Sequence, residues 1–261
     1  MVKHSYVSVL QNLLYTDYLL FKRIFGTKLI DLSIEVVTVI GVFGYLLPAF
    51  GLDSSYGSFM VAGMCATAGM FEVFPSIMNL VADFEGDRII SYYSTLPIPT
   101  SLVFIRLFLT YSLSAMLMAL WVIPLGKLVL WHQFSLSVIH VPKFLLAVIF
   151  MSFLYGALTL WVASFVPAME RISTVWIRFI YPMWFLGGYQ FSWYVLHNFF
   201  PNLACLNLLN PFTYVMEMIR ASILGQEGYI NFWLCLVALT LFIIFFMWHG
   251  IKRLKTKLDF I

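Results

Sequence analysis

The stretch FLLAVIFMSFLYGALTLWVASFV, residues 144–166, contains no charged side chain. It is long enough to cross a bilayer as an α-helix, which takes about 20 consecutive apolar residues. Other stretches are similarly long and apolar, although Arg178 and Pro182 interrupt one of them. We therefore predict an all-α membrane protein with six spans, over residues 29–50, 57–82, 101–124, 144–166, 174–192 and 229–250.

The composition of the chain agrees with these spans. Of its 261 residues, 62% are apolar and only 10% are charged, and the mean hydropathy is +0.93. A soluble domain has about a quarter of its residues charged, so an ordinary soluble enzyme is excluded. A transmembrane β-barrel would have short alternating segments in place of continuous apolar runs. We expect a single transmembrane domain over residues 1–261.

The positions of Lys and Arg predict the orientation. With the N-terminus in the cytosol, most of the fifteen basic residues lie on the cytosolic side, and only Lys127, Lys143 and Arg220 lie outside. Cytosolic loops of membrane proteins carry such an excess of basic residues. An even number of spans then returns the C-terminus to the cytosol. No cleaved signal peptide is expected, because residues 1–4 are not followed by a compact apolar core and a cleavage site.

Residues 5–25 are expected to form a helix on the membrane surface. Its apolar side chains recur at three- and four-residue spacing: Val7, Leu10, Leu14, Tyr18, Phe21 and Phe25. The opposite face is polar and ends in Lys22 and Arg23, a pattern typical of interfacial helices. A short arm packed on the bundle is the alternative.

Two connectors are predicted on the cytosolic side and a longer one outside. Residues 84–96 are long enough for a helix of their own and are followed by prolines. Residues 167–173 form a tight second cytosolic connector. Residues 194–225 are half apolar and interrupted by prolines, so we expect an outer re-entrant hairpin of two short helices that dip into the membrane.

The second half of this hairpin carries helix-boundary signals. Asn210 suits an N-cap, Pro211 suits the first helical position, and Gly225 can adopt the left-handed conformation that ends a helix. These positions predict a helix over residues 211–224.

No catalytic or metal-binding motif is found. Gly126-Lys127 is the nearest approach to a phosphate-binding loop, but Trp121 stands where the first glycine of that motif must be. The histidines and cysteines do not have the spacing of a metal site. We therefore expect no catalytic residue, no metal and no cofactor on this chain. If the chain transports a molecule uphill, the energy must come from elsewhere.

The densest charge cluster contains Asp83, Glu85, Asp87 and Arg88. One interpretation is a magnesium–pyrophosphate site of a membrane-embedded prenyl or phospholipid transferase, using Asp83 and Asp87. Such a site needs a second acidic cluster, and the other cytosolic connector offers only Glu170. Ordinary solvated loop charge is a second interpretation.

A docking surface for a soluble partner is the third interpretation of this cluster. A short helix with a charged start and a proline stop is rigid enough to transmit motion. The candidate coupling residues on the two connectors are Glu85, Asp87, Arg88, Tyr92, Glu170 and Arg171.

Two stretches resemble the permeases of ATP-binding-cassette (ABC) type-2 exporters, which include lipo-oligosaccharide, polysaccharide and drug efflux permeases. The first stretch is FEGDR at 84–88 followed by YYSTLPIP at 92–99. The second is LNPFTY at 209–214 followed by Glu217, Arg220 and Leu224-Gly225. The order of segments is similar over nearly the whole chain. Ser94-Thr95 replaces the paired leucines common in that family.

This resemblance implies a permease homodimer bound to two nucleotide-binding ATPase subunits. ATP and magnesium would be held by those subunits, and the 84–96 helix would sit in a cleft of the ATPase. The outer hairpin, with Asn210, Pro211, Glu217 and Arg220, would cap the exit of the pathway. The location implied is the bacterial inner membrane, with lipid around the spans and no role for nucleic acid.

Charged residues inside the predicted spans need partners or a wet cavity. We predict that Glu35 pairs with Arg106 or Arg178, because all three lie near the cytosolic ends of their spans. Asp31 is explained by favourable charge at a helix N-terminus. Glu72 lies near the midplane with no base predicted at its depth, so it is either protonated or faces a hydrated pathway.

The function that the sequence favours is outward transport of an amphipathic or hydrophobic molecule, such as a lipid-linked glycan, lipid or drug. An ion-coupled secondary transporter is the alternative within transport. That class would favour an inverted repeat, and none is found in the sequence.

Overall fold

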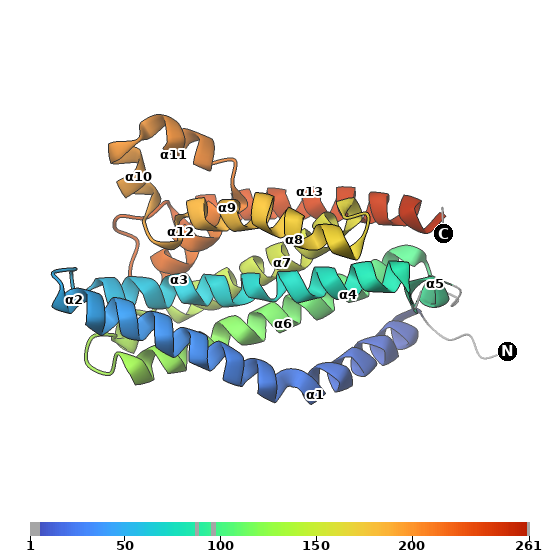
Figure 1. Cartoon of the computed structure of the whole chain (residues 1–261), viewed down its shortest axis with the longest axis horizontal. Coiled ribbons are helices and arrows are strands. Elements are labelled where there is room, and N and C mark those ends of the chain that lie inside the picture. Colours follow the sequence, from blue (N-terminus) through green and yellow to red (C-terminus); the bar gives the residue numbers. More distant parts are fainter. Residues whose placement is uncertain (1–5, 87–88, 95–97, 260–261) are drawn as a thin grey trace.

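A computed structural model describes residues 6–86, 89–94 and 98–259 of the chain, and these residues form helices without any strand. The first half is built from long helices joined by shorter ones (Figure 1). Their bounds are α1 (Tyr6–Gly41), α2 (Leu47–Ala49), α3 (Tyr56–Phe71), α4 (Val73–Glu85), α5 (Ile89–Ser94), α6 (Thr100–Val129) and α7 (Val141–Phe165). The second half is α8 (Ile172–Val175), α9 (Tyr181–Trp184), α10 (Trp193–Phe199), α11 (Pro201–Asn207), α12 (Pro211–Ile223) and α13 (Phe232–Asp259).

Several of these helices are long and apolar enough to cross a bilayer, as expected of a multi-pass membrane protein. Within the described residues there are five such segments: Ser8–Ala49, Tyr56–Glu85, Thr100–Val129, Val141–Phe165 and Phe232–Leu258. They correspond to five of the six predicted spans. The all-α architecture predicted from the apolar runs is therefore confirmed.

The predicted span 174–192 is irregular. Between Ile172 and Tyr189 the short helices α8 and α9 alternate with π-helical turns over Trp176–Ile180 and Phe185–Tyr189. Pro182 lacks the N–H that a regular helix needs, and Gly188 has a left-handed φ of 95° that ends the run. A sixth span at this position stays a prediction.

The first helix differs from the prediction of a separate interfacial helix over 5–25. Helix α1 is continuous from Tyr6 to Gly41, although it is visibly bent (Figure 1). Asp31 therefore lies inside a helix, and the explanation of its charge by a helix N-terminus is wrong. The first half of α1 contacts α6, where Asp17 pairs with Arg106.

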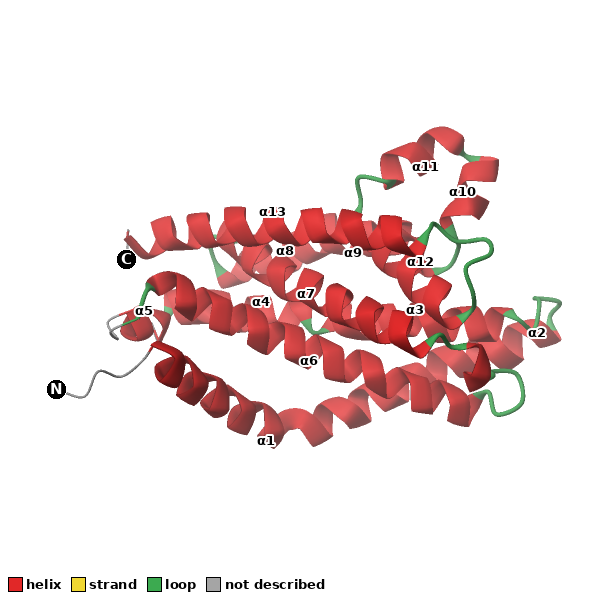
Figure 2. Cartoon of the chain, turned by 180° about the vertical axis from the view of Figure 1, so that it is seen from behind, coloured by secondary structure: helices red, strands yellow, loops and turns green. Residues whose placement is uncertain are grey.

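Different helices lie at the two ends of the bundle (Figures 1 and 2). The start of α1, the end of α4, helix α5 and the end of α13 lie together, and we call this the terminal end. Helix α2 and helices α10 to α12 lie at the other end, which we call the hairpin end. The predicted two-helix hairpin over 194–225 contains three helices, because Pro201 and Pro211 each begin a new one.

Helix α12 is the most deeply buried element. Every residue from Pro211 to Ile223 is buried, and the helix packs against α3, α7 and α13. Its start agrees with the sequence signals: the Asn210 side chain accepts a hydrogen bond from the Phe212 N–H, and Pro211 is the first helical residue. Gly225 follows with a φ of 105°. The predicted helix 211–224 is therefore confirmed to within one residue.

Candidate functional site

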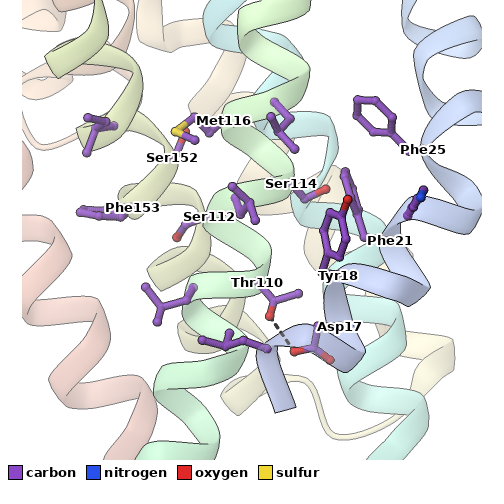
Figure 3. Close-up of a pocket in the computed structure, with 16 residues that line it drawn as sticks. Asp17, Tyr18, Phe21, Phe25, Thr110, Ser112, Ser114, Met116, Ser152 and Phe153 are labelled. Atoms are coloured by element: carbon purple, nitrogen blue, oxygen red, sulfur yellow. Dashed lines mark hydrogen bonds between the residues drawn. The ribbon is translucent and has the colours of Figure 1, made fainter. Parts of the chain in front are cut away.

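A cavity of about 840 Å³ opens between α1, α6 and α7 (Figure 3). Its volume is within the range of sites for small organic ligands. Most of its wall is apolar, with Tyr18, Phe21 and Phe25 contributed by α1, Met116 by α6 and Phe153 by α7. An apolar or amphipathic molecule of moderate size fits such a wall.

A buried ion pair lies at the edge of this cavity. Asp17 of α1 lines the cavity and accepts two hydrogen bonds from the Arg106 guanidinium, of which the Nε–H···Oδ2 distance is 2.7 Å. The Thr110 hydroxyl donates to the same carboxylate at 2.8 Å (Figure 3). The Arg106 guanidinium also lies 4.4 Å from the centre of the Tyr93 ring. These contacts compensate for the loss of water around both charges.

A second ion pair lies on the same side of the bundle. The Glu72 carboxylate, at the break between α3 and α4, pairs with the Lys28 ammonium of α1. The Ser114 hydroxyl, which lines the cavity, donates to the same carboxylate at 2.5 Å. The Glu72 carboxylate therefore has a basic partner, Lys28, and the prediction that no basic residue lies at its depth is wrong. Lys28 was missed because it precedes the predicted start of the first span.

The pairing predicted for Glu35 is wrong. Arg106 pairs with Asp17, and Arg178 is exposed in the π-helical turn after α8. Glu35 has no ion-pair partner among the described residues. Depth along a span cannot predict pairing, because α1 presents Asp17 and not Glu35 to Arg106. The available signal was Asp17 itself, an acid placed among the apolar residues of an otherwise hydrophobic helix face.

Two hydroxyl groups of the cavity wall are buried without a hydrogen-bond partner in the described part of the chain. They belong to Ser112 of α6 and Ser152 of α7. A buried hydroxyl without a partner carries the cost of its desolvation. The arrangement can bind and orient an amphipathic molecule.

At the terminal end, the structure brings the two predicted cytosolic connectors together. The Glu85 carboxylate at the end of α4 accepts a hydrogen bond of 3.1 Å from the Met169 N–H. Glu170 and Arg171 follow Met169 directly and are exposed, and Tyr92 of α5 is 64% exposed. Asp87 and Arg88 lie outside the described residues.

Asp83 has a local structural role. Its two carboxylate oxygens accept hydrogen bonds from the N–H groups of Ile89 and Ile90, at 2.8 and 3.0 Å, and so hold the start of α5. Carboxylates near the first turn of a helix are favourable. Of the predicted coupling helix over 84–96, the structure places Phe84 and Glu85 at the end of α4 and Ile89–Ser94 in α5, and residues 87–88 and 95–96 lie outside the described residues.

At the hairpin end, Arg220 is the centre of a buried cluster that we call the Arg220 cluster. Its guanidinium donates to the carbonyl oxygens of Gly188, Tyr189 and Phe191 at 2.5, 2.7 and 3.0 Å. It also lies 3.7 Å from the centre of the Phe59 ring of α3. Arg220 therefore ties α12 to α3 and to the end of the irregular helical segment over Ile172–Tyr189.

Glu217 completes the Arg220 cluster. Its carboxylate accepts hydrogen bonds from the N–H groups of Trp193 and Ile230, at 2.8 and 2.9 Å. Trp193 is the first residue of α10, and Ile230 lies between α12 and α13, so Glu217 links the two ends of the hairpin segment. Burial raises the pKa of Glu217, while these two N–H groups and Arg220 oppose the rise. Burial also lowers the pKa of Arg220 to about 10, so its guanidinium stays charged at neutral pH.

Asn210 has a second role beside its N-cap. Its side-chain amide donates to the Met183 carbonyl at 2.5 Å and so joins α12 to α9. Asn210, Glu217 and Arg220, which belong to the LNP stretch and the residues after it, therefore hold the hairpin end together. None of them lines the cavity between α1, α6 and α7.

A scan against protein-family models finds no match to this chain, and a search of curated proteins finds no significant match. Membership of the ABC type-2 permeases is therefore a proposal that rests on the quoted motifs and on the geometry of the described residues.

Proposed function

We propose that this protein is the permease subunit of an ABC-type exporter. It moves an amphipathic or hydrophobic molecule, such as a lipid-linked glycan, a lipid or a drug, outward across the membrane. A separate ATPase subunit, which holds ATP and magnesium, drives the transport. The permease works as a homodimer in the bacterial inner membrane, with both termini in the cytosol.

The observation that carries this proposal is the joining of the two connectors at the terminal end. The hydrogen bond from the Met169 N–H to Glu85 links the end of α4 to the segment before α8. Glu170 and Arg171 are exposed on the segment before α8, and Tyr92 is exposed on α5, which follows α4 along the chain. A docked ATPase that moved this surface would move α4 and the irregular helical segment over Ile172–Tyr189 together, because the Glu85–Met169 hydrogen bond joins the end of one to the start of the other.

The cavity between α1, α6 and α7 supports an amphipathic cargo. Its wall is mainly aromatic and aliphatic, but the polar residues Asp17, Thr110 and Ser114 also line it. Such a site favours a molecule with an apolar body and a hydrogen-bonding group. Asp83, in contrast, already caps α5 with both oxygens, so a transferase that uses Asp83 and Asp87 has less support.

The first test is association with an ATPase encoded by a neighbouring gene. Co-expressed wild-type permease should retain that ATPase through purification in detergent. The combined changes Glu85→Lys, Asp87→Lys and Arg88→Glu should lower its retention at least about tenfold, because each reverses a charge in the docking surface. Retention is measured by quantitative gel analysis together with ATPase activity in the purified complex.

Charge reversal at exposed Arg178, Arg178→Glu, is the matched control and should leave retention unchanged. Both variants should elute as folded protein in size-exclusion chromatography. An active, ATP-independent monomer that transports with an ion gradient would instead support the secondary transporter and contradict the proposal.

The second test addresses the cavity. Leu113 lines the cavity from α6 and is partly exposed, so Leu113→Trp should fill part of it without disturbing the core. Saturable binding of the apolar dye N-phenylnaphthylamine to the purified protein should weaken about tenfold, which corresponds to about 1.4 kcal/mol. Dye fluorescence titration measures this affinity.

Leu128→Trp is the matched control for the dye experiment. Leu128 also lies on α6 and is exposed, but it does not line the cavity. If both variants bind the dye as the wild type does, the cavity is not the site of binding.

A further inference from the structure

A second groove, of about 580 Å³, lies at the terminal end between the end of α7 and the last turns of α13. Its wall combines aromatic and basic side chains, including Phe165, Trp248, Lys252, Arg253 and Lys257. This combination differs from the apolar cavity between α1, α6 and α7. The groove has no part in the function proposed above.

The basic side chains of the groove are held in place, and one of them, Lys257, also interacts electrostatically with Glu85. The Arg253 guanidinium lies 4.1 Å from the centre of the Phe165 ring, and the Lys252 ammonium lies 5.6 Å from that of Trp248. The Lys257 ammonium donates to the Val166 carbonyl at 2.9 Å. The ion pairs found among the described residues do not involve any of these three cations. The groove therefore presents concentrated positive charge suited to an anion.

An apolar stripe on α13 leads directly to this charge. Leu241, Ile244 and Trp248 are 65%, 60% and 63% exposed, and Lys252 follows at the same spacing. Residues three and four apart share one face of a helix, so the four side chains form a continuous row. The row is apolar along the membrane-spanning part of α13 and cationic at its end.

We propose that this groove binds an anionic phospholipid of the surrounding membrane. The phosphate of the lipid is held by Lys252 and Arg253, and an acyl chain lies along Leu241, Ile244 and Trp248. Basic pockets beside membrane-spanning helices are suited to anionic headgroups. A soluble anion would make no use of the apolar stripe, and an acidic protein surface would leave the exposed aromatic and aliphatic side chains unmatched.

The test uses the full-length protein in detergent, titrated with short-chain phosphatidylglycerol or with phosphatidylcholine of equal chain length. Phosphatidylglycerol should bind saturably and raise the midpoint of thermal unfolding, and phosphatidylcholine should bind at least about tenfold more weakly. The double variant Lys252→Gln/Arg253→Gln should lose at least about tenfold in affinity for phosphatidylglycerol, because each basic residue contributes to headgroup attraction. Native mass spectrometry counts the bound lipids.

The matched control is Arg23→Gln/Lys143→Gln, which removes the same net charge outside the groove and should bind phosphatidylglycerol as the wild type does. A separate variant, Trp248→Ala, keeps both cations and shortens the apolar stripe. It should weaken phosphatidylglycerol binding about threefold or more. Its folding can be checked independently of the double variant by size-exclusion chromatography.

Three results would overturn the proposal. Equal binding of the two lipids would show that the positive charge is not used. If inorganic phosphate raised the midpoint of thermal unfolding as much as phosphatidylglycerol does, the groove would be a soluble-anion site. Loss of ATPase retention in the double variant with unchanged phosphatidylglycerol affinity would assign the groove to a protein partner.

Discussion

Replacing Arg220 with methionine should lower the free energy of unfolding by about 3–5 kcal/mol. The change keeps much of the side-chain length but removes the hydrogen bonds to the carbonyls of Gly188, Tyr189 and Phe191. It also leaves Glu217, which is 1% exposed, without the compensating positive charge beside it. Buried polar groups that lose their partners carry the full cost of desolvation.

Thermal unfolding in detergent, followed by tryptophan fluorescence, measures this effect as a fall in midpoint of roughly 10 °C. Arg220→Lys should recover only part of the loss, because an ammonium group cannot reproduce the planar guanidinium that spans three carbonyls. Arg178→Met is the matched control, since Arg178 is exposed, and it should change the midpoint little. A small effect of Arg220→Met would show that the Arg220 cluster is not needed to hold the hairpin end.

Replacing Arg106 with methionine should also cost about 3–5 kcal/mol, because it leaves the Asp17 carboxylate buried without its cationic partner. Arg106 is 4% exposed, and its guanidinium donates hydrogen bonds to both carboxylate oxygens of Asp17. The first half of α1 should loosen from α6 as a result. Increased hydrogen exchange of residues 8–25 would report that loosening.

The double variant Asp17→Leu/Arg106→Met separates the ion pair from its surroundings. It should be more stable than Arg106→Met alone, because no unpaired charge remains in the protein interior. If the two single changes and the double change are additive in unfolding free energy, Asp17 and Arg106 do not interact, and the geometry of this pair is contradicted.

Part of the architecture follows from local signals in the chain. The run at 144–166 is apolar on all sides, and it forms the buried helix α7 (Val141–Phe165). Asn210, Pro211 and Gly225 mark the boundaries of α12, because capping and proline placement depend on neighbouring residues only. Predictions of this kind succeeded because they need no knowledge of distant parts of the chain.

The charged pairs could not be predicted in the same way. Glu35 and Arg106 lie at similar calculated depths, yet Arg106 pairs with Asp17, which was placed in a separate surface helix. Lys28 was assigned to the cytosol, yet it reaches Glu72. Both errors have one cause: α1 continues through residues 25–29 and packs along α6, so Asp17 and Lys28 both reach partners inside the bundle.

The candidate sites show the same division. The sequence alone identified the two cytosolic connectors and the LNP stretch, because charge clusters and prolines stand out from an apolar background. It did not identify the cavity between α1, α6 and α7, whose wall is made of ordinary aromatic, aliphatic and hydroxyl side chains from three distant segments. Nor did it connect the apolar row of α13 with the end of α7.

The amino-acid sequence by itself determined that this is a helical membrane protein, where its longest apolar helices lie and where α12 begins. These properties depend on hydrophobicity and on short-range hydrogen bonding along the chain. Only the tertiary structure decided which charges pair, which hydroxyls face a cavity and how Arg220 joins three segments. Those outcomes depend on how the helices are rotated and brought together, and residues far apart in sequence supply both sides of each contact.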